Sequence, residues 1–225
     1  MARWSGLPRV SGSFWETVAN NGRQEWFGTA FGPVCKSARC TPERRQTLES
    51  LVQLAVELAR EGREGRKIGT LFVIGDVENV SARSRPLLLD PLYGHPADVL
   101  HVDRPDFRET VKELAQLDGG FLVADDGTFV SAGRYIDVDV SAPTNFIPGL
   151  GTRHAAAASV TRETKATAVA VSQSSVVRVF SHGEIRAEII PELFLMSRDG
   201  LFTREADVTP LPELGVTLAV AGDAG

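Results

Sequence analysis

Apolar residues recur at helical spacing in the segment that begins at Thr41. Thr41-Pro42-Glu43 offers a hydroxyl cap, a proline suited to the first helical position and an acid in the first turn, so we predict that a helix begins here. The apolar positions that follow fit one face of a helix: Leu48, Leu51, Val52, Ala55, Leu58 and Ala59. We expect the helix to end at Gly62 or Gly65.

Short runs of branched and aromatic residues predict strands farther along the chain. These are Ile68–Gly75, Phe121–Ala124, Phe129–Tyr135, Ala166–Val171 and Val176–Phe180. Asp125-Asp126-Gly127 is expected to be a hairpin turn. A second helix is expected with Asp106 as its cap, and a third over His154–Thr164. A loop with Pro86, Pro91 and Pro96 lies between the first predicted strand and the second helix, and another apolar segment spans Ile185–Met196.

The order of these elements indicates the fold class. Strands outnumber helices but alternate with them, and some strand pairs are joined by hairpins. This pattern predicts an α/β protein with a central mixed β-sheet flanked by helices. We assign residues 41–198 to this domain, residues 1–40 to an N-terminal extension of unknown role and residues 199–225 to a C-terminal extension.

Composition narrows the class of function. An apolar fraction of 43% is enough for a sizeable core, and a net charge of -5 argues against general nucleic-acid binding. Of the two cysteines, Cys35 and Cys40, a reduced pair is favoured over a disulfide. The start of the chain lacks the apolar region of a secretory signal, and no stretch has the roughly 20 apolar residues of a membrane helix. We therefore expect a cytoplasmic protein without a membrane span.

Asp118-Gly119-Gly120 lies between a predicted helix and a predicted strand. A carboxylate at a sheet edge is the hard oxygen ligand that Mg²⁺ or Mn²⁺ prefers beside phosphates, and glycines let a ligand approach the backbone. The alternative is a plain turn. Asp125-Asp126-Gly127 is assigned no chemistry, because it fits a hairpin tip.

Gly149-Leu150-Gly151-Thr152-Arg153-His154 leads into the third predicted helix. Arg153 and His154 in a first helical turn oppose the helix dipole, so a bound anion is expected to compensate them. Phosphate oxygens would satisfy the free N–H groups, Thr152 and Arg153 together. The alternative is a simple loop with Thr152 as the helix cap. A third polar group, Ser172-Gln173-Ser174-Ser175, is either a turn between strands or a contact to phosphate or metal.

Taken together, these features resemble the diadenylate cyclase (DAC) domain family, which includes the DNA-integrity scanning proteins. The resemblance covers roughly Lys67 to Pro191. It rests on five phrases: Gly69 to Ile74, Leu117 to Phe121, Ala132 to Ile136, Leu150 to Ala157 and Ala168 to Ser172. The Gly-Thr-Arg-His string followed by a helix is the most specific of them. The resemblance implies condensation of two ATP molecules into cyclic di-AMP with release of two pyrophosphates, using Mg²⁺ or Mn²⁺.

The resemblance also implies roles for individual residues. Asp118 would bind the metal and help to activate the ribose 3′-hydroxyl, with Arg153 and His154 beside it in the catalytic set. The nucleotide would be bound by Gly119, Gly120, Ile136, Leu150, Gly151, Thr152, Arg153, His154, Ala155, Ala156, Ser172 and Gln173. Each ATP needs a second ATP in reverse orientation, so a homodimer or higher homo-oligomer with facing sites is expected.

Three departures from the family pattern bear on activity. The usual Asp-Gly-Ala is Asp-Gly-Gly, the Arg-His-Arg string ends in Ala155, and the acid after the strand serine is Gln173. None of them removes Asp118 or the anion site, so an active cyclase is favoured. The alternative is a nucleotide-binding sensor, or an interaction domain, that has lost turnover.

Overall fold

The computed structural model describes residues 41–138 and 151–191 in full, together with the backbone of two later strands. It divides into two units, Met1–Pro191 and Glu192–Gly225. The predicted N-terminal extension and Leu150 lie outside the described residues, as does the end of the apolar segment 185–196. The domain boundaries stay predictions. In the described residues, no helix is long and apolar enough to cross a membrane.

Helix α2, Pro42–Glu61, begins and ends where the sequence predicted. The Thr41 hydroxyl accepts a hydrogen bond from the backbone N–H of Arg44 at 3.2 Å. At the other end Gly62 has φ 59°, and an added Cβ would lie 2.2 Å from the carbonyl oxygen of Arg66. Only glycine fits there, because both the left-handed backbone and the close approach exclude a side chain.

Seven strands form one mixed sheet in the order β2-β4-β3-β1-β5-β6-β7. They are β1 Thr70–Ile74, β2 Ser84–Pro86, β3 Gly120–Val123, β4 Phe129–Ile136, β5 Thr167–Val171, β6 Val177–Ser181 and β7 Glu184–Ile189. Strands β1 and β3 are parallel, and every other neighbouring pair is antiparallel. The α/β fold with a central mixed sheet is therefore confirmed.

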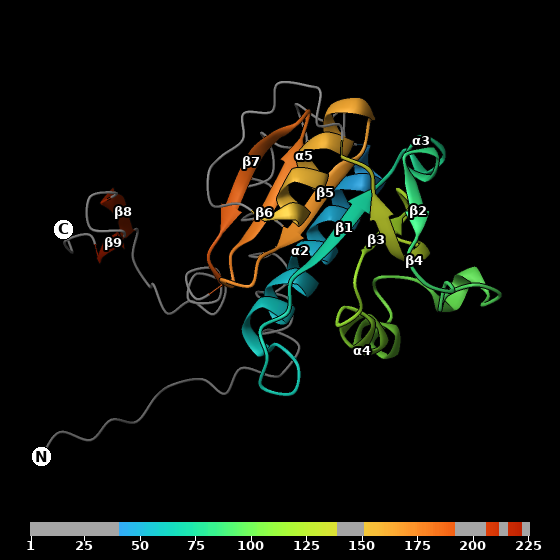
Figure 1. Cartoon of the computed structure of the whole chain (residues 1–225). Helices are drawn as coiled ribbons and strands as arrows, with labels where there is room; N and C mark the ends of the chain where they lie inside the picture. Colours follow the sequence, from blue (N-terminus) through green and yellow to red (C-terminus); the bar gives the residue numbers. More distant parts are fainter. Residues whose placement is uncertain (1–40, 139–150, 192–205, 212–215, 222–225) are drawn as a thin grey trace, which may run out of the picture. The chain divides into compact units, whose positions relative to one another are not determined.

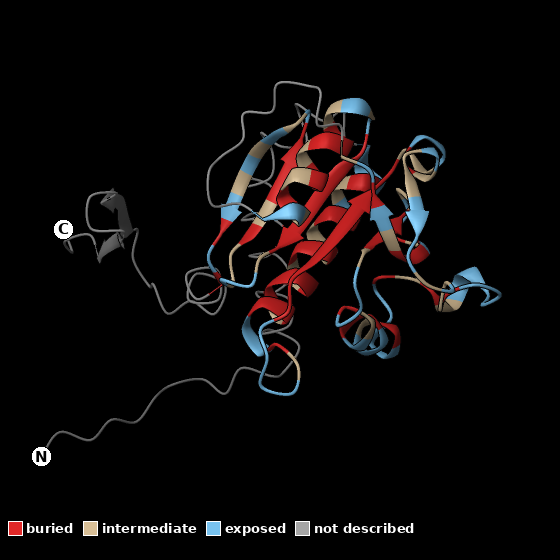
Figure 2. Ribbon diagram, in the orientation of Figure 1, coloured by how far each residue is buried: buried red, intermediate tan, exposed pale blue. Residues whose placement is uncertain are grey.

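Helices cover both faces of this sheet. Helix α5, Thr152–Glu163, lies over one face and α2 over the other (Figure 1). Strands β1 and β5 are buried along their whole length, as expected for strands covered on both sides (Figure 2). On the α5 side, Leu71 and Val73 pack with Ala157 and Val160. Phe72 points to the opposite face and stacks on Phe121, with ring centroids 5.1 Å apart.

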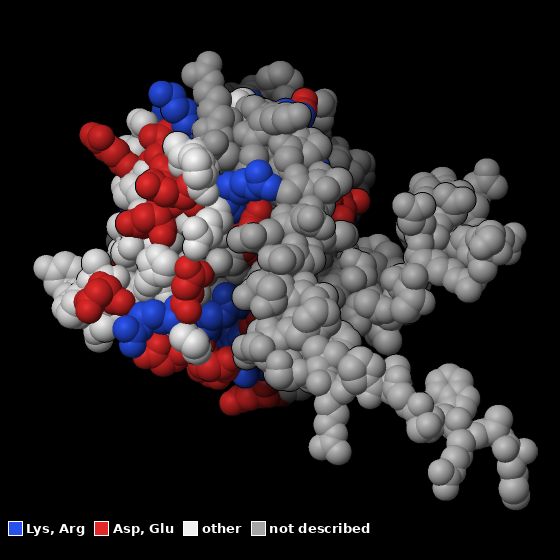
Figure 3. Space-filling model, turned by 180° about the vertical axis from the view of Figure 1, so that it is seen from behind, with Lys and Arg blue, Asp and Glu red and all other residues white. Residues whose placement is uncertain are grey.

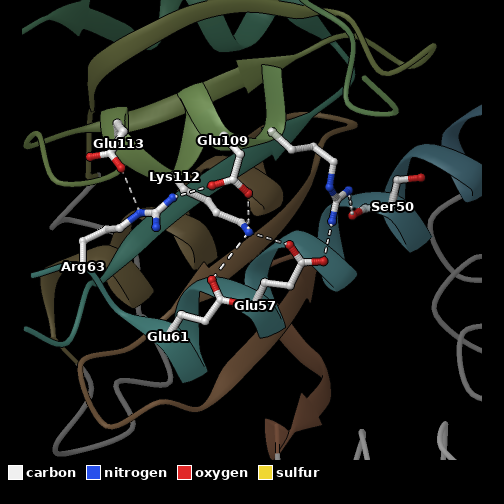
Figure 4. Close-up of polar contacts among 8 residues, drawn as sticks. Ser50, Glu57, Glu61, Arg63, Glu109, Lys112 and Glu113 are labelled. Carbon is white, nitrogen blue, oxygen red and sulfur yellow. Dashed lines mark hydrogen bonds and ion pairs between the residues drawn. The ribbon is translucent and has the colours of Figure 1, made fainter. Parts of the chain in front are cut away.

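Helix α4, Pro105–Leu114, joins the α2 side of the sheet through ion pairs (Figure 4). Lys112 Nζ lies 3.0 Å from Glu57 on α2 and 2.8 Å from Glu109 on its own helix. Burial alone would lower the pKa of Lys112, but hydrogen bonds to these two glutamates raise it above its ordinary value. Basic and acidic side chains accordingly lie next to one another on this face (Figure 3). The charges here hold two helices together.

Four predictions about the elements need correction. Asp106 does not cap α4, because Arg104 is the N-cap and Pro105 the first helical residue, which puts Asp106 inside the first turn. Helix α5 begins two residues earlier than predicted, at Thr152. The proline-containing loop includes the short helix α3, Val77–Ala82, strand β2 and the 3₁₀ turn Ala97–Val99. The apolar segment after residue 184 begins as the edge strand β7.

The second unit has its own pair of strands. β8, Ala206–Leu211, and β9, Val216–Ala221, run antiparallel, with Ala206 opposite Ala221 and Leu211 opposite Val216.

Candidate active site

The predicted polar clusters meet at one edge of the sheet, where β1 and β3 begin. Asp118 and Gly119 lead into β3, and Gly69 leads into β1. Strand β5 runs the opposite way, with Val171 opposite Thr70, so Ser172 emerges at this same edge. Ligands in open sheets with parallel strands usually bind at the carboxyl ends of those strands. Here the candidate residues gather at the amino ends of the parallel pair.

Asp118 and Arg153 are brought together from separate motifs. Arg153 Nη2 lies 3.6 Å from Asp118 Oδ1, and the Asp118 side chain is 90% exposed. An added Cβ on Gly69 would lie 3.0 Å from Arg153 Nη1 and 3.2 Å from the carbonyl oxygen of Val171. The glycine therefore leaves the space across which the guanidinium reaches Asp118.

The amino end of α5 forms the second part of the site. Gly151 is the N-cap and has no side chain to accept a hydrogen bond, and the first turn contains no acid. Thr152 is the first helical residue, so the alternative that it caps the helix is wrong. Thr152 is exposed and Arg153 half-buried beside these helix N–H groups. An uncapped helix start with a cation in its first turn favours a bound anion.

His154 lies deeper in the same first turn. It is 6% exposed, and its ring packs 6.0 Å from the Phe180 ring centroid. Its Nε2 lies 3.2 Å from Arg178 Nη1. Burial lowers the pKa of His154, and the charges of Arg178 and Arg153 lower it further against the opposing charge of Glu188. The ring is therefore uncharged at neutral pH.

These groups line a cavity of about 460 Å³. Its walls are Gly151, Thr152, Arg153, His154, Val171, Ser172, Gln173, Ser174 and Arg178. The Ser172–Ser175 segment is the polar turn foreseen as one alternative, since the Ser172 backbone and hydroxyl both bond to Val176. Ser172, Gln173 and Ser174 nevertheless line the cavity. A second hollow of about 280 Å³, between α4 and residues 91–100, contains none of the predicted site residues.

Gly119 has a structural reason for being glycine that the sequence did not show. Its φ is +101°, and an added Cβ would lie 2.7 Å from the carbonyl carbon of Gly133 and 2.8 Å from the backbone nitrogen of Arg134. Close approach to β4 therefore excludes a side chain, whether or not a ligand is present. At Gly120 an added Cβ would lie 3.0 Å from the carbonyl oxygen of Leu71, which leaves little room for the alanine of the usual pattern.

Some predicted residues lie apart from the cavity. Ile136 and Ala156 belong to the buried core between α5 and the sheet, and Ala155 is half-buried beside them on the helix. The Asp125-Asp126-Gly127 turn lies at the far end of β3, as predicted, where Asp125 pairs with Arg44 of α2.

Sequence reasoning missed Gly69 and Arg178 as site residues. Arg178 had a signal, since a single charged residue interrupts the apolar run Val176–Phe180.

The residues present fit a divalent cation that is held mainly by its substrate. Asp118 offers an exposed carboxylate beside Arg153, which lines the cavity. Among residues 41–138 and 151–191, no three His, Cys, Asp or Glu side chains cluster as a complete metal site. Mg²⁺ is commonly bound by one or two carboxylates plus substrate phosphates, so one carboxylate beside an anion site suits it.

Comparison with known proteins identifies the family. The DAC family model, described as DisA bacterial checkpoint controller nucleotide-binding, matches residues 57–185. The chain belongs to this family.

Two relatives are named diadenylate cyclase. The one from Methanocaldococcus jannaschii is 44% identical over 160 residues, which are 70% of this chain and 50% of that protein. The one from Haloferax volcanii is 38% identical over 149 residues, which are 65% of this chain and 54% of that protein. The chain thus spans about half the length of these relatives.

Two solved structures are similar at low sequence identity. One is a double mutant of DacA from Staphylococcus aureus, with 18% identity, a TM-score of 0.45, and coverage of 70% of this chain and 97% of that one. The other is a hypothetical membrane spanning protein from Bacillus cereus, with 19% identity, a TM-score of 0.46, and coverage of 77% and 89%.

Proposed function

We propose that this protein is a diadenylate cyclase, which condenses two ATP molecules into cyclic di-AMP and releases two pyrophosphates. The observation that carries the proposal is the approach of Asp118 to Arg153 beside the uncapped start of α5. The carboxylate of Asp118 can bind a metal ion or a substrate hydroxyl. The Arg153 guanidinium and the free N–H groups of α5 can bind phosphate. The two relatives named diadenylate cyclase support the same activity.

The residues divide into two groups by their chemistry. The α5 N–H groups, Thr152 and Arg153 bind triphosphate oxygens, and Ser172, which also lines the cavity, adds a hydroxyl. Asp118 accepts a hydrogen bond from the ribose 3′-hydroxyl of the second ATP and orients that oxygen. The 3′-oxygen then forms a bond to the α-phosphorus as the bond to pyrophosphate breaks, and its proton passes to Asp118.

Asp118, with the triphosphate, would also hold Mg²⁺ or Mn²⁺. When bound, the cation neutralises phosphate charge and favours departure of pyrophosphate. Gln173 on the cavity wall contributes a neutral amide where an acid would add charge, so we propose that the metal depends chiefly on Asp118 and the nucleotide.

The reaction needs two copies of the site. Each ATP is attacked by the 3′-hydroxyl of another ATP in reverse orientation, which a homodimer with facing sites provides, alone or within a larger homo-oligomer. Specific activity should therefore rise with protein concentration in a dilution series. Constant specific activity from a stable monomer would contradict this arrangement. Because ATP is the substrate, we place the protein in the cytoplasm.

The experiment that tests the function is direct. Purified protein is incubated at high concentration with ATP and either metal across a range of pH, and the products are separated by chromatography. Cyclic di-AMP supports the proposal, and its absence in every condition refutes it. Tight nucleotide binding without product would instead identify a sensor, the second candidate, which is favoured by the absence of any carboxylate among the described residues that line the cavity.

A further inference from the structure

Arg178 on β6 is an unusual residue for its strand. Its neighbours Val177 and Val179 are fully buried, and the Arg178 side chain is itself only 15% exposed. A guanidinium so far from water needs partners. It pairs with Glu188, which lies directly opposite on β7, and it contacts His154 on α5. Residues of two strands, β6 and β7, and of the covering helix α5 thus meet at this one guanidinium.

The chemistry of this contact determines the state of the histidine. An arginine side chain has only N–H donors and keeps its charge at all ordinary pH values. His154 Nε2, 3.2 Å from Arg178 Nη1, must therefore be the acceptor. A histidine that accepts at Nε2 is neutral and has its proton on Nδ1.

Resting on the function proposed above, we propose that Arg178 is a positioning residue of the active site, which holds His154 as a neutral ring protonated on Nδ1. Glu188 is the anchor that keeps the guanidinium in place. His154 then contributes a neutral N–H donor, and positive charge toward the triphosphate comes from Arg153 and Arg178.

The surroundings of His154 agree with this assignment. The charged groups that face it are Arg153 on its own helix, Arg178 on β6 and Glu188 on β7, and the first two outweigh the third. Arg178 also lines the cavity beside Arg153. A second guanidinium therefore reaches the anion site from the sheet, although the helix has Ala155 where the usual family string has arginine.

The tautomer can be observed without any catalysis. The chain contains four histidines, so the ring nitrogens of the ¹⁵N-labelled full chain can be resolved by long-range proton–nitrogen NMR, with His154→Gln used to assign the signal. We expect Nδ1 protonated and Nε2 unprotonated at pH 7. In Arg178→Met, which keeps the length but removes donor and charge, we expect the other tautomer to appear and the titration of His154 to move to higher pH.

Arg178→Lys and Arg186→Met complete the test. Lysine retains a donor and a charge, so it should restore the Nδ1–H form in part. Arg186, on β7, is also paired with a carboxylate but does not line the cavity, so its substitution should leave the His154 signal unchanged. A wild-type ring protonated on Nε2, or a signal that Arg178→Met does not alter, would overturn the proposal.

Nucleotide binding and turnover separate this inference from the function on which it rests. Affinity for an unreactive ATP analogue should fall at least about tenfold in Arg178→Met and should be unchanged in Arg186→Met. If the tautomer is as expected and the analogue binds but no cyclic di-AMP forms in wild type, the cyclase function fails and the positioning role stands. If product forms and Arg178→Met matches wild type in kcat and KM, the positioning role fails.

Discussion

Arg153 lies across the amino end of β1, over Gly69, with its Nη2 3.6 Å from Asp118 Oδ1. The pair is well exposed on the carboxylate side, so its attraction contributes little to folding stability. Its importance lies in position, because it places a carboxylate beside a guanidinium that lines the cavity.

Asp118→Asn should abolish turnover and leave much of the nucleotide binding intact. The substitution removes the carboxylate that we propose serves the metal and the 3′-hydroxyl, but it leaves Arg153 and the α5 N–H groups in place. Product formation and binding of an unreactive ATP analogue are the two measurements. Asp126→Asn is the matched control, since Asp126 accepts a hydrogen bond from the Thr128 N–H at the other end of β3. If Asp126→Asn lost activity and Asp118→Asn did not, the active site would lie at the other end of β3 from the one proposed.

Gln173→Glu should lower the metal concentration needed for half-maximal activity. The wild-type site should favour Mn²⁺, which accepts neutral and nitrogen ligands more readily than Mg²⁺. An added carboxylate on the cavity wall strengthens Mg²⁺ binding through charge. Metal titrations of activity for both proteins measure the effect. Identical titrations would mean that Gln173 serves only the turn.

Gly119→Ala should destabilise the fold more than Gly120→Ala. At Gly119 the left-handed backbone and the 2.7 Å approach to Gly133 both oppose a side chain, whereas at Gly120 the nearest atom would be 3.0 Å away. We expect a loss of about 2–3 kcal/mol in the free energy of unfolding for Gly119→Ala and about 1 kcal/mol for Gly120→Ala. Urea unfolding gives both values, and the reverse order would contradict the described geometry.

Asp125→Ala should destabilise the protein through Arg44. The Arg44 side chain is 10% exposed and binds Asp125 and the carbonyl oxygen of Lys165, so it ties α2 to two loops. Removal of Asp125 leaves that cation nearly buried without its carboxylate, at a cost of about 2 kcal/mol because Asp125 is itself part-exposed.

Glu49→Gln is the matched control for this change. It breaks a part-exposed i,i+4 pair with Arg45 on the same helix and should cost about 0.3–0.5 kcal/mol in urea unfolding. Equal losses in the two variants would show that the Arg44 contacts add nothing.

Asp76 should make stability depend on pH in the acid range. Burial favours its neutral form, but hydrogen bonds from the Lys165 backbone N–H at 2.8 Å and the Asn79 amide at 2.7 Å outweigh burial and lower the pKa of Asp76. A carboxyl with a lowered pKa in the folded state stabilises the protein above its unfolded pKa of about 3.9. That stability is lost as pH falls through the folded pKa.

Asp76→Asn tests this contribution. Asparagine tolerates the left-handed backbone at this position, φ 49°, so the variant removes chiefly the charge. It should be less stable than wild type at pH 7, and the difference should shrink below about pH 4. Glu78→Gln, an exposed acid two residues along, is the control. A difference that stays constant with pH would contradict the role of the Asp76 charge.

The sequence predicted those features that depend on local pattern. The cap at Thr41, the turn at Gly127 and the strands β1 and β5 follow from neighbouring residues alone, and all are confirmed. Helix α3 and strand β2 are only six and three residues long, too short for periodicity to reveal.

The site was predictable only where its residues are contiguous. Asp118 and Arg153 were found because each stands in a recognisable motif. Gly69 and Arg178 were missed because their roles arise from strand pairing across β1, β5 and β6, which no local spacing encodes.

The distance between the Arg44–Asp125 pair and the Asp118–Arg153 pair affects how the sequence can change, in evolution or by design. The Arg44–Asp125 contact lies at the carboxyl ends of β1 and β3, whereas Asp118 and Arg153 lie at the amino ends, about 16 Å of strand away. Mutations at that distance generally contribute independently. Stabilising substitutions near Arg44 and Asp125 can therefore compensate for stability lost through substitutions near Asp118 and Arg153. New specificities can thus arise around the cavity without loss of the fold.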